Sequence, residues 1–194
     1  MNAWGSDKKR CVNLGCGCDL RKSNSQVHWT NTDRIRLPGV DVIHDLDTFP
    51  YPFETNTFDV AVLHQALEHL RNSIPALEEV HRICKPGAKV LISVPYFASC
   101  GAFCHMEHRT YYGWNTFDYF TRPMSEIKPN VKYKLISRRI IFSNSHNPGM
   151  RLLSAIITPL INCCDIASLT YQRFFCFILP SEELRICLEV EKDE

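Results

Sequence analysis

Apolar and polar positions follow two alternating patterns over the first two-thirds of the chain. Short runs of apolar and β-branched residues are separated by stretches with helical spacing or turn-forming residues, which is typical of a parallel sheet with crossover connections. The runs 58–63 and 88–94 are almost continuously apolar, as expected for central strands covered on both faces. The strands predicted from this pattern are 11–14, 29–32, 40–43, 58–63 and 88–94.

A helix is predicted between the last two of these strands, over residues 74–84. Apolar residues recur there at helical spacing, while Glu78 and Glu79 occupy the other side. The sequence Lys85-Pro86-Gly87 then ends the helix and turns the chain into the next strand. The residues that recur at this spacing are Ile74, Leu77, Val80, His81 and Cys84.

The last part of the chain completes the predicted sheet. Residues 96–130 form a long irregular stretch, of the kind usually kept for binding. The runs 135–142 and 184–190 are predicted to pair antiparallel, with a helical segment over 149–164 and an aromatic stretch over 167–180 between them. We therefore expect an α/β fold, a Rossmann-like three-layer sandwich whose seven-stranded sheet is mostly parallel and has an antiparallel closing strand.

Composition and charge exclude several classes of protein. Hydrophobic residues make up 45% and charged residues 22% of the 194 residues, which is ordinary globular usage and enough for one domain. The net charge of +1 gives no reason to expect a nucleic acid partner, and we expect the clusters Lys8–Arg10 and Arg138-Arg139 to be solvated. No apolar run reaches the roughly 20 residues that span a bilayer, and the nearest, 150–164, contains Arg151 and Asn162.

Ten cysteines are many for a chain of this length. The first residues have no apolar core of a secretory signal, so a cytoplasmic location with reduced thiols is expected. Several cysteines (Cys11, Cys84, Cys176 and Cys187) lie among apolar residues, where cysteine packs as a small hydrophobe.

A nucleoside-binding pattern follows the first predicted strand. Gly15 and Gly17 would let the backbone turn tightly and approach a ligand. Asp33 follows the second strand at roughly the 20-residue offset where a carboxylate meets ribose hydroxyls, although a surface turn would also explain it. His44-Asp45-Leu46 follows the third strand, where an adenine could be held. A dinucleotide motif would need glycine in place of Leu20, and no phosphate-binding Gly-Lys-Ser/Thr occurs.

Four motifs occur in order over residues 11–95, about half of the chain. They are Asn13–Gly17, Pro52–Asp59, Leu67–Leu70 and Leu77–Gly87. This series resembles the type 11 branch of the class I S-adenosylmethionine-dependent methyltransferases, and the ending 171–190 resembles members of glycan and cell-envelope pathways. The resemblance implies S-adenosylmethionine as cofactor and methyl transfer as the reaction. It also implies one domain over 1–194, with a cofactor-binding half (8–95) and an acceptor-side half (96–194).

The resemblance further implies which residues hold the cofactor. The first motif would line its methionine and ribose end, and Asp33 would hold the ribose hydroxyls. Asp45 and Leu46 would flank the adenine, and His64 would lie near the sulfonium. The implied cofactor-binding residues are Asn13, Gly15, Cys16, Gly17, Asp33, Asp45, Leu46 and His64.

Two departures from the family pattern concern the first crossover. The third glycine of the family's first motif is Asp19 here. The connection 18–28 is polar and short, so its helix is expected to be reduced to a turn.

The candidate acceptor side is the loop 104–112. His105 and His108 are candidate general bases, needed only if the acceptor must lose a proton, and bridging of loop carbonyls is an equal alternative for both. Arg109 would orient an acidic group, with Tyr111 and Tyr112 shaping the pocket. His69 is expected to hold a loop by hydrogen bonding.

No metal site is predicted. Cys100, Cys104, His105 and His108 lack the paired spacing of structural zinc sites. The vicinal pair Cys163-Cys164 is expected to pack in an apolar helix.

The acceptor is expected to be a small molecule, a sugar or a lipid-linked compound. The fourth strand ends Leu63-His64-Gln65-Ala66, unlike the motif for amino methylation of bases, and the chain has no Pro-Cys pair for attack on cytosine. The alternative is a non-catalytic relative that acts as a binding or interaction protein.

Residues 149–180 are more apolar than one buried stripe requires. Simple packing across the sheet is the plain explanation. The alternatives are a lid over the acceptor pocket, which we favour among them, a homodimer contact or a membrane-surface contact.

Overall fold

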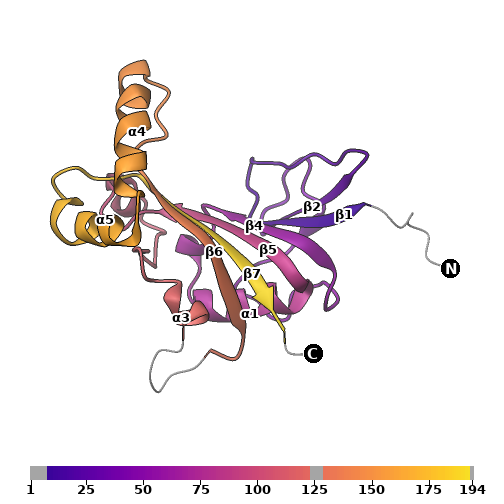
Figure 1. Ribbon diagram of the computed structural model, residues 1–194. Helices are drawn as coiled ribbons and strands as arrows, with labels where there is room; N and C mark the ends of the chain where they lie inside the picture. Colours follow the sequence, from indigo (N-terminus) through magenta and orange to yellow (C-terminus); the bar gives the residue numbers. More distant parts are fainter. Residues whose placement is uncertain (1–7, 123–128, 193–194) are drawn as a thin grey trace.

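The computed structural model describes residues 8–122 and 129–192, and its centre is a seven-stranded sheet (Figure 1). The strand order is β3-β2-β1-β4-β5-β7-β6. The predicted α/β fold, with a mostly parallel sheet and an antiparallel closing strand, is confirmed. The strands are β1 (Lys9–Leu14), β2 (Val27–Asp33), β3 (Val42–Ile43), β4 (Phe58–His64), β5 (Cys84–Pro95), β6 (Lys132–Ile141) and β7 (Glu183–Glu191).

The strand register brings the ends of the parallel strands to one edge of the sheet. β1 lies between β2 and β4 and pairs in parallel with both. β2 also pairs in parallel with β3, and β4 with β5. β7 inserts antiparallel between β5 and β6. Leu14, Asp33 and His64 therefore end adjacent strands, and the loops that follow them meet at one edge, where open α/β sheets bind ligands.

One face of the sheet is covered by the helix α1 (Ser73–Ile83), with the short helix α3 (Asp118–Thr121) beside it (Figure 1). The side chain of Asn72 caps α1 by accepting a hydrogen bond from the Ile74 N–H at 3.0 Å. Leu77, Val80 and Ile83 are fully buried against the strands. The helix predicted over 74–84 is thus confirmed, and it provides most of the core on this side.

The opposite face of the sheet has no crossover helix over β1 and β4 among the described residues. Residues 15–26 and 34–41 connect the first three strands without a helix, so the predicted loss of the first crossover helix is confirmed. A groove lined by side chains of β1, β4, β5 and β7 remains on this face, and Leu91 is 42% exposed there. The expected third layer is reduced on this side, because a short polar connection cannot form an amphipathic helix.

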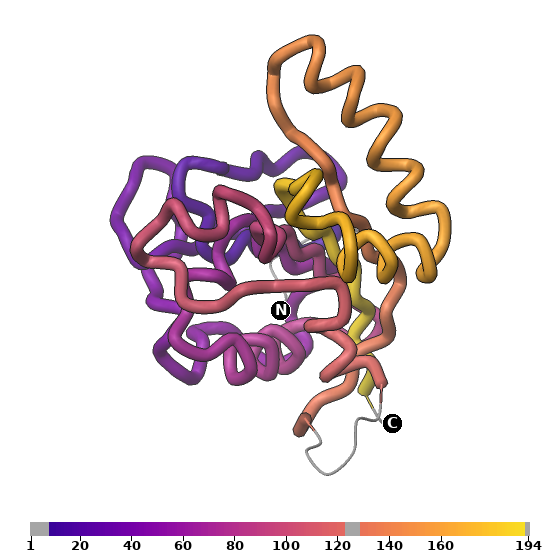
Figure 2. Tube along the Cα trace, turned by 90° about the vertical axis from the view of Figure 1, so that its left-hand side faces the viewer, coloured from indigo at the N-terminus to yellow at the C-terminus, as the bar shows by residue number. Residues whose placement is uncertain are grey.

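The segment between β6 and β7 forms α4 (Pro148–Ile161), α5 (Asp165–Thr170) and the turn of π-helix η2 (Tyr171–Phe175). α4 projects away from the sheet, while α5 and η2 lie at the edge where the parallel strands end (Figures 1 and 2). Within the described residues, no single helix is long and apolar enough to cross a membrane. Taken together, α4 and residues 165–175 are long and apolar enough to do so by length and composition alone, but the two helices are bent by 111° where they meet.

Arg138 departs from the expectation that it is solvated. Its side chain is 5% exposed and pairs with Asp118 at 2.9 Å, and its guanidinium lies 4.4 Å from the centre of the Trp114 ring. Because β6 places this side chain toward α3, the ion pair attaches the irregular segment 96–122 to the sheet.

Candidate functional site

A turn of two glycines begins the site at the end of β1. Gly15 has φ +67°, and a Cβ there would lie 2.8 Å from the Ala66 Cβ, so no other residue fits without displacement. Gly17 has φ +48°, and nothing lies within 4 Å of where its Cβ would be. The first glycine lets two loops pack closely, and the second leaves open space in front of the backbone.

Asp33 fixes this glycine turn at the end of β2. Its carboxylate accepts hydrogen bonds from the Gly17 N–H at 2.8 Å and the Ile35 N–H at 2.9 Å. The side chain lines a cavity, although only 8% of the residue is exposed. Each oxygen keeps a lone pair for a ligand hydroxyl, since a carboxylate offers about four acceptor positions.

Asp45 and Leu46 form the next part of the wall, in the loop after β3. The Asp45 carboxylate accepts a bond from the Asp47 N–H at 3.0 Å, and Tyr51 donates its hydroxyl to the Leu46 carbonyl at 3.0 Å. Glu79 and Arg82 of α1 hold Tyr51 in turn: Glu79 accepts the Tyr51 N–H at 2.7 Å, and Arg82 donates to the Tyr51 carbonyl at 3.0 Å. The conformation of this wall therefore depends on α1.

These residues enclose one cavity of about 260 Å³. It lies where the loops after β1, β2, β3 and β4 meet, as the sequence predicted for the cofactor. Its lining residues are Gly15, Gly17, Asp33, Arg34, Ile35, Leu37, His44, Asp45, Leu46, Asp47, Gln65, Ala66, His69, Leu70 and Glu107.

Three residues implied by the family resemblance lie elsewhere. Asn13 is buried and supports the first crossover, because its amide donates to the Asp19 carbonyl at 2.7 Å. Cys16 is buried behind the glycine turn, and burial raises the pKa of its thiol to about 11. His64 lines the groove on the opposite face of the sheet, 3.5 Å from the Asp19 carboxylate, because alternation along β4 turns it away from the cavity. The structure does not place His64 beside the cofactor cavity.

A cluster of ionisable groups adjoins the cavity after β4, and its member Glu68 was not singled out from the sequence. Gln65 adopts φ +51°, unusual for a residue with a Cβ, and the 3-10 turn η1 (Leu67–His69) follows. Glu68 is 1% exposed, and neither carboxylate oxygen has a hydrogen-bond partner among the described residues. Burial raises the pKa of this carboxyl to about 7, and the charge of Glu183 adds to the rise.

The loop after the helix α2 (Cys100–Cys104) packs onto this cluster. The Arg109 N–H donates to the Glu68 carbonyl at 2.7 Å, and His108 donates from Nδ1 to the Ala102 carbonyl at 2.9 Å. The ring of His108 lies 4.7 Å from that of His69 and 5.0 Å from that of His105, measured between centroids.

Other predicted residues of this loop differ in exposure. Tyr112 is buried, with its hydroxyl bonded to the Leu67 carbonyl at 3.1 Å, whereas Tyr111 is 46% exposed. Tyr112 therefore belongs to the core under the site. An ion pair between Arg34 and Glu107, 3.4 Å apart, joins this loop to the turn after β2.

The cavity fits a nucleoside cofactor. The open space before Gly17, the Asp33 carboxylate and the apolar side of Leu46 succeed one another along its wall. A nucleoside would place its chain next to the open backbone at Gly17, its ribose hydroxyls at Asp33 and its flat base against Leu46. The glycine turn lacks the Gly-Lys-Ser/Thr sequence of a phosphate-binding loop.

Sequence comparison finds methyltransferases. Residues 8–92 match the family described as a methyltransferase domain. The demethylmenaquinone methyltransferase of a Geobacillus species is 32% identical over 75 residues, which are 39% of this chain and 32% of that enzyme. The chain thus spans about a third of the length of that relative.

Comparison with solved structures extends over nearly the whole chain. A SAM-dependent methyltransferase from Archaeoglobus fulgidus superposes with a TM-score of 0.55 at 14% identity, over 94% of this chain and 86% of that one. The [4+2]-cyclase SpnF gives a TM-score of 0.59 at 13% identity, over 96% of this chain and 76% of that one. At such identities the likeness establishes a shared fold, and the cyclase illustrates that the fold does not fix the reaction.

Proposed function

We propose that this chain, which belongs through residues 8–92 to the type 11 branch of the class I methyltransferases, binds S-adenosylmethionine and transfers its methyl group. The observation that carries the proposal is the cavity that joins Gly15, Gly17, Asp33 and Leu46 on one side to the histidine-containing loop on the other. One site therefore combines the features of a nucleoside pocket with side chains suited to contact an acceptor.

The chain's own residues would mainly position the reactants. When bound, S-adenosylmethionine supplies an already activated methyl group, so alignment of the acceptor and exclusion of water account for much of the acceleration. Asp33 would accept the ribose hydroxyls with the lone pairs left free by Gly17 and Ile35. Leu46 would pack against the adenine.

An acceptor that must lose a proton would find an imidazole beside the cavity. Of the candidates His105 and His108, the geometry favours His108. Its Nδ1 bears the hydrogen that is donated to the Ala102 carbonyl, which leaves Nε2 with a free lone pair. His105 is exposed and stacks on His108.

For the acceptor we favour a lipid-linked compound over a soluble small molecule or sugar. The reason is an exposed apolar surface at the edge of the sheet where the cavity also lies. It is formed by Leu152, Leu153, Ile156, Leu160, Ile166, Leu169, Phe174, Phe175, Phe177 and Ile178, each at least 40% exposed. We call this set the apolar surface. The residues that line the cofactor cavity come from 15–107, so α4 does not line it, and the lid over the acceptor pocket that we favoured from the sequence stays a prediction.

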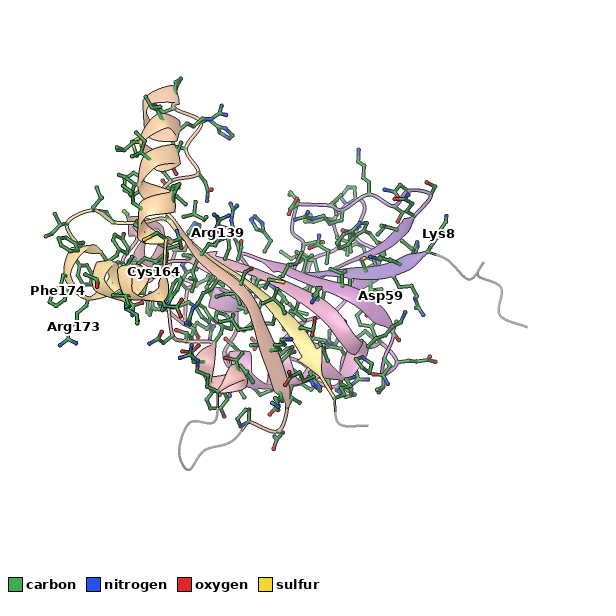
Figure 3. The ribbon with its side chains drawn as sticks, viewed as in Figure 1. Lys8, Asp59, Arg139, Cys164, Arg173 and Phe174 are labelled. Atoms are coloured by element: carbon green, nitrogen blue, oxygen red, sulfur yellow. The ribbon has the colours of Figure 1, made fainter. Side chains whose placement is uncertain are left out.

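A lipid bilayer is the occupant that we propose for the apolar surface. Arg151, Asp165 and Arg173 are the only charged residues in 148–180, and Phe174 and Arg173 project from the end of the molecule opposite the N-terminal strand (Figure 3). Apolar side chains are exposed along α4, α5 and the turn after them, which suits shallow insertion into a membrane surface. A second copy of the chain is the alternative that the test must distinguish.

Titration with S-adenosylhomocysteine tests the cofactor part of the proposal. The purified chain should bind it in calorimetry, and an excess of adenosine should compete because both would use Asp33 and Leu46. A chain that binds neither compound would be the non-catalytic alternative. Incubation with methyl-labelled cofactor and separated lipid and water-soluble cell extracts then tests the acceptor. We expect label in the lipid fraction, and label confined to the water-soluble fraction would contradict a lipid-linked acceptor.

A further inference from the structure

Glu68, His69 and His108 bring three potential metal ligands together beside the cofactor cavity. One ligand atom from each residue lies within 4.8 Å of the others. The backbone holds the two segments in place, since the Arg109 N–H and the Thr110 N–H both donate to the Glu68 carbonyl, at 2.7 and 3.4 Å. The cluster is therefore a fixed feature of the packing between η1 and the loop 105–110.

The protonation of His108 suits a metal ligand. A carbonyl oxygen only accepts hydrogen bonds, so the 2.9 Å contact with the Ala102 carbonyl requires a hydrogen on Nδ1. The free lone pair is then on Nε2. Histidines that bind metals commonly donate the other ring N–H to a carbonyl or carboxylate in this way, which fixes the tautomer and the ring orientation.

Glu68 lacks the partner that a buried carboxylate requires. Only 1% of the residue is exposed, both carboxylate oxygens are without a hydrogen bond among the described residues, and the buried Nδ1 of His69 is also unpartnered. Buried polar atoms in folded proteins almost always have a partner, and a buried carboxylate is usually paired with a cation or binds a metal. No Lys or Arg forms an ion pair with Glu68 in the described residues.

We propose that Glu68, His69 and His108 bind one divalent transition-metal ion. Two imidazoles and one carboxylate are the ligand set of several catalytic zinc sites, and imidazole ligands disfavour Mg²⁺ and Ca²⁺. Ligand atoms around a tetrahedral Zn²⁺ lie roughly 3.4 Å apart, given bonds of about 2.0–2.2 Å. The ligand atoms, now within 4.8 Å of one another, would therefore need to approach by up to about 1.4 Å when the ion binds. From the sequence we expected no metal site, and the only candidate ligands weighed there were Cys100, Cys104, His105 and His108. The proposed site differs from that set in Glu68 and His69.

The position of the ion would constrain the acceptor. His69 lines the cofactor cavity, so the fourth position of the ion would be reached from there. Catalytic zinc keeps such a position for water or a substrate oxygen and lowers the pKa of the bound hydroxyl. The geometry thus favours an acceptor that is methylated on oxygen. With its Nε2 bound to the ion, His108 would no longer act as the base, and the acceptor hydroxyl, acidified by the ion, would lose its proton to solvent water before its oxygen takes the methyl group.

Metal binding can be measured without any methyl-transfer assay. The whole chain is stripped with a chelator and titrated with Zn²⁺ against a chromogenic competitor, and Co²⁺ is used as a spectroscopic probe. We expect one equivalent bound, and a loss of affinity of at least about 100-fold in Glu68→Gln and in His108→Ala. Because neighbouring thiols could also take up zinc, the matched control is Cys100→Ser with Cys104→Ser, which removes two exposed thiols 3.3 Å apart and should keep full affinity.

Thermal unfolding gives a second measurement in which folding defects are visible. In the absence of metal, Glu68→Gln should unfold at the same temperature as the wild type or higher, because an unpaired buried carboxylate is removed. Added Zn²⁺ should raise the unfolding temperature of the wild type and leave that of the variant unchanged. Equal zinc affinity in Glu68→Gln, or a Co²⁺ spectrum with thiolate charge transfer that the cysteine control abolishes, would overturn the proposal. Neither result would bear on cofactor binding.

Discussion

At the scale of single residues, three buried carboxylates differ in what surrounds them. Asp118 pairs with a buried guanidinium, Asp33 accepts two backbone N–H groups, and Glu68 has no partner. The first arrangement stabilises the fold and the second shapes a loop while leaving acceptor positions free. The third destabilises the chain unless a proton or a cation is bound. Residue type alone therefore does not determine the role of a carboxylate here.

Asp33→Asn tests the cofactor site at this scale. The amide retains one oxygen but cannot accept from both Gly17 and Ile35 and bind ribose hydroxyls as an anion. We expect affinity for S-adenosylhomocysteine to fall by about 10- to 100-fold, which corresponds to about 1.5–3 kcal/mol for hydrogen bonds to a charged group. Calorimetry measures the loss, and His64→Ala, on the opposite face of the sheet, is the control that should bind as the wild type does. Unchanged affinity in Asp33→Asn would exclude the ribose role.

At the scale of elements, α1 does more than cover the sheet. Arg82 bonds both to Glu79 and to the carbonyls of Tyr51 and Phe53, so the helix fixes the loop whose Leu46 lines the cavity. The guanidinium of Arg82 holds the pKa of the Glu79 carboxyl below its ordinary value. A packing element is thereby connected to the adenine end of the site.

Arg82→Ala should both destabilise the fold and weaken cofactor binding. Removal of several charged hydrogen bonds is expected to lower the free energy of unfolding by about 2–3 kcal/mol. Because the pKa of Glu79 is depressed, the part of this contribution that comes from the ion pair with Glu79 is complete above the ordinary value of 4.5 and disappears as the pH falls through the depressed value, whereas the bonds to the two carbonyls do not depend on pH. Denaturant unfolding at neutral and acidic pH measures the difference, alongside calorimetry with S-adenosylhomocysteine.

The control for this prediction is Lys85→Ala, which breaks the partly exposed pair with Asp59 and should cost about 1 kcal/mol. An Arg82→Ala chain that binds S-adenosylhomocysteine as tightly as the wild type would show that the loop keeps its conformation without the helix.

The elements were predictable from the sequence to the extent that local pattern determines them. The apolar runs gave the strands, and the polar composition of 18–28 predicted the missing helix. The site was predictable where it depends on backbone turns, as at Gly15 and Gly17. The burial of charged side chains could not be predicted from the sequence. Arg138 and Glu68 lie inside the molecule because segments distant in the sequence pack over them. The side of the sheet on which His64 lies depended likewise on strand register, which a motif does not give.

At the scale of the whole molecule, the cofactor cavity and the apolar surface lie at the same edge of the sheet. The loops that line the cavity and the segment α5–η2 both face the viewer in Figure 2. The ring of Phe177 in the apolar surface lies 5.8 Å from that of Phe97, whose N–H donates to the carbonyl of Tyr112 at the end of the loop 104–112 at 3.0 Å. A chain bound to a membrane through the apolar surface would therefore have its acceptor loop beside the lipid, which suits an acceptor anchored there.

Leu160→Glu combined with Ile178→Glu tests this arrangement. The two residues are 64% and 77% exposed and line one apolar groove between α4, α5 and the turn after η2, so the variant should remain folded. Burial of each side chain in lipid contributes about 1.5–3 kcal/mol. We therefore expect binding to phosphatidylcholine vesicles with added phosphatidylglycerol, measured by cosedimentation, to fall at least about 100-fold. Ile74→Glu places one carboxylate on α1, away from the apolar surface, at a residue that is 37% exposed, and should bind as the wild type does. A wild-type chain that ignores vesicles but forms dimers in light scattering, which the double variant dissociates, would assign the apolar surface to a second copy instead. Vesicle binding that survives the double variant would remove the apolar surface from membrane contact altogether.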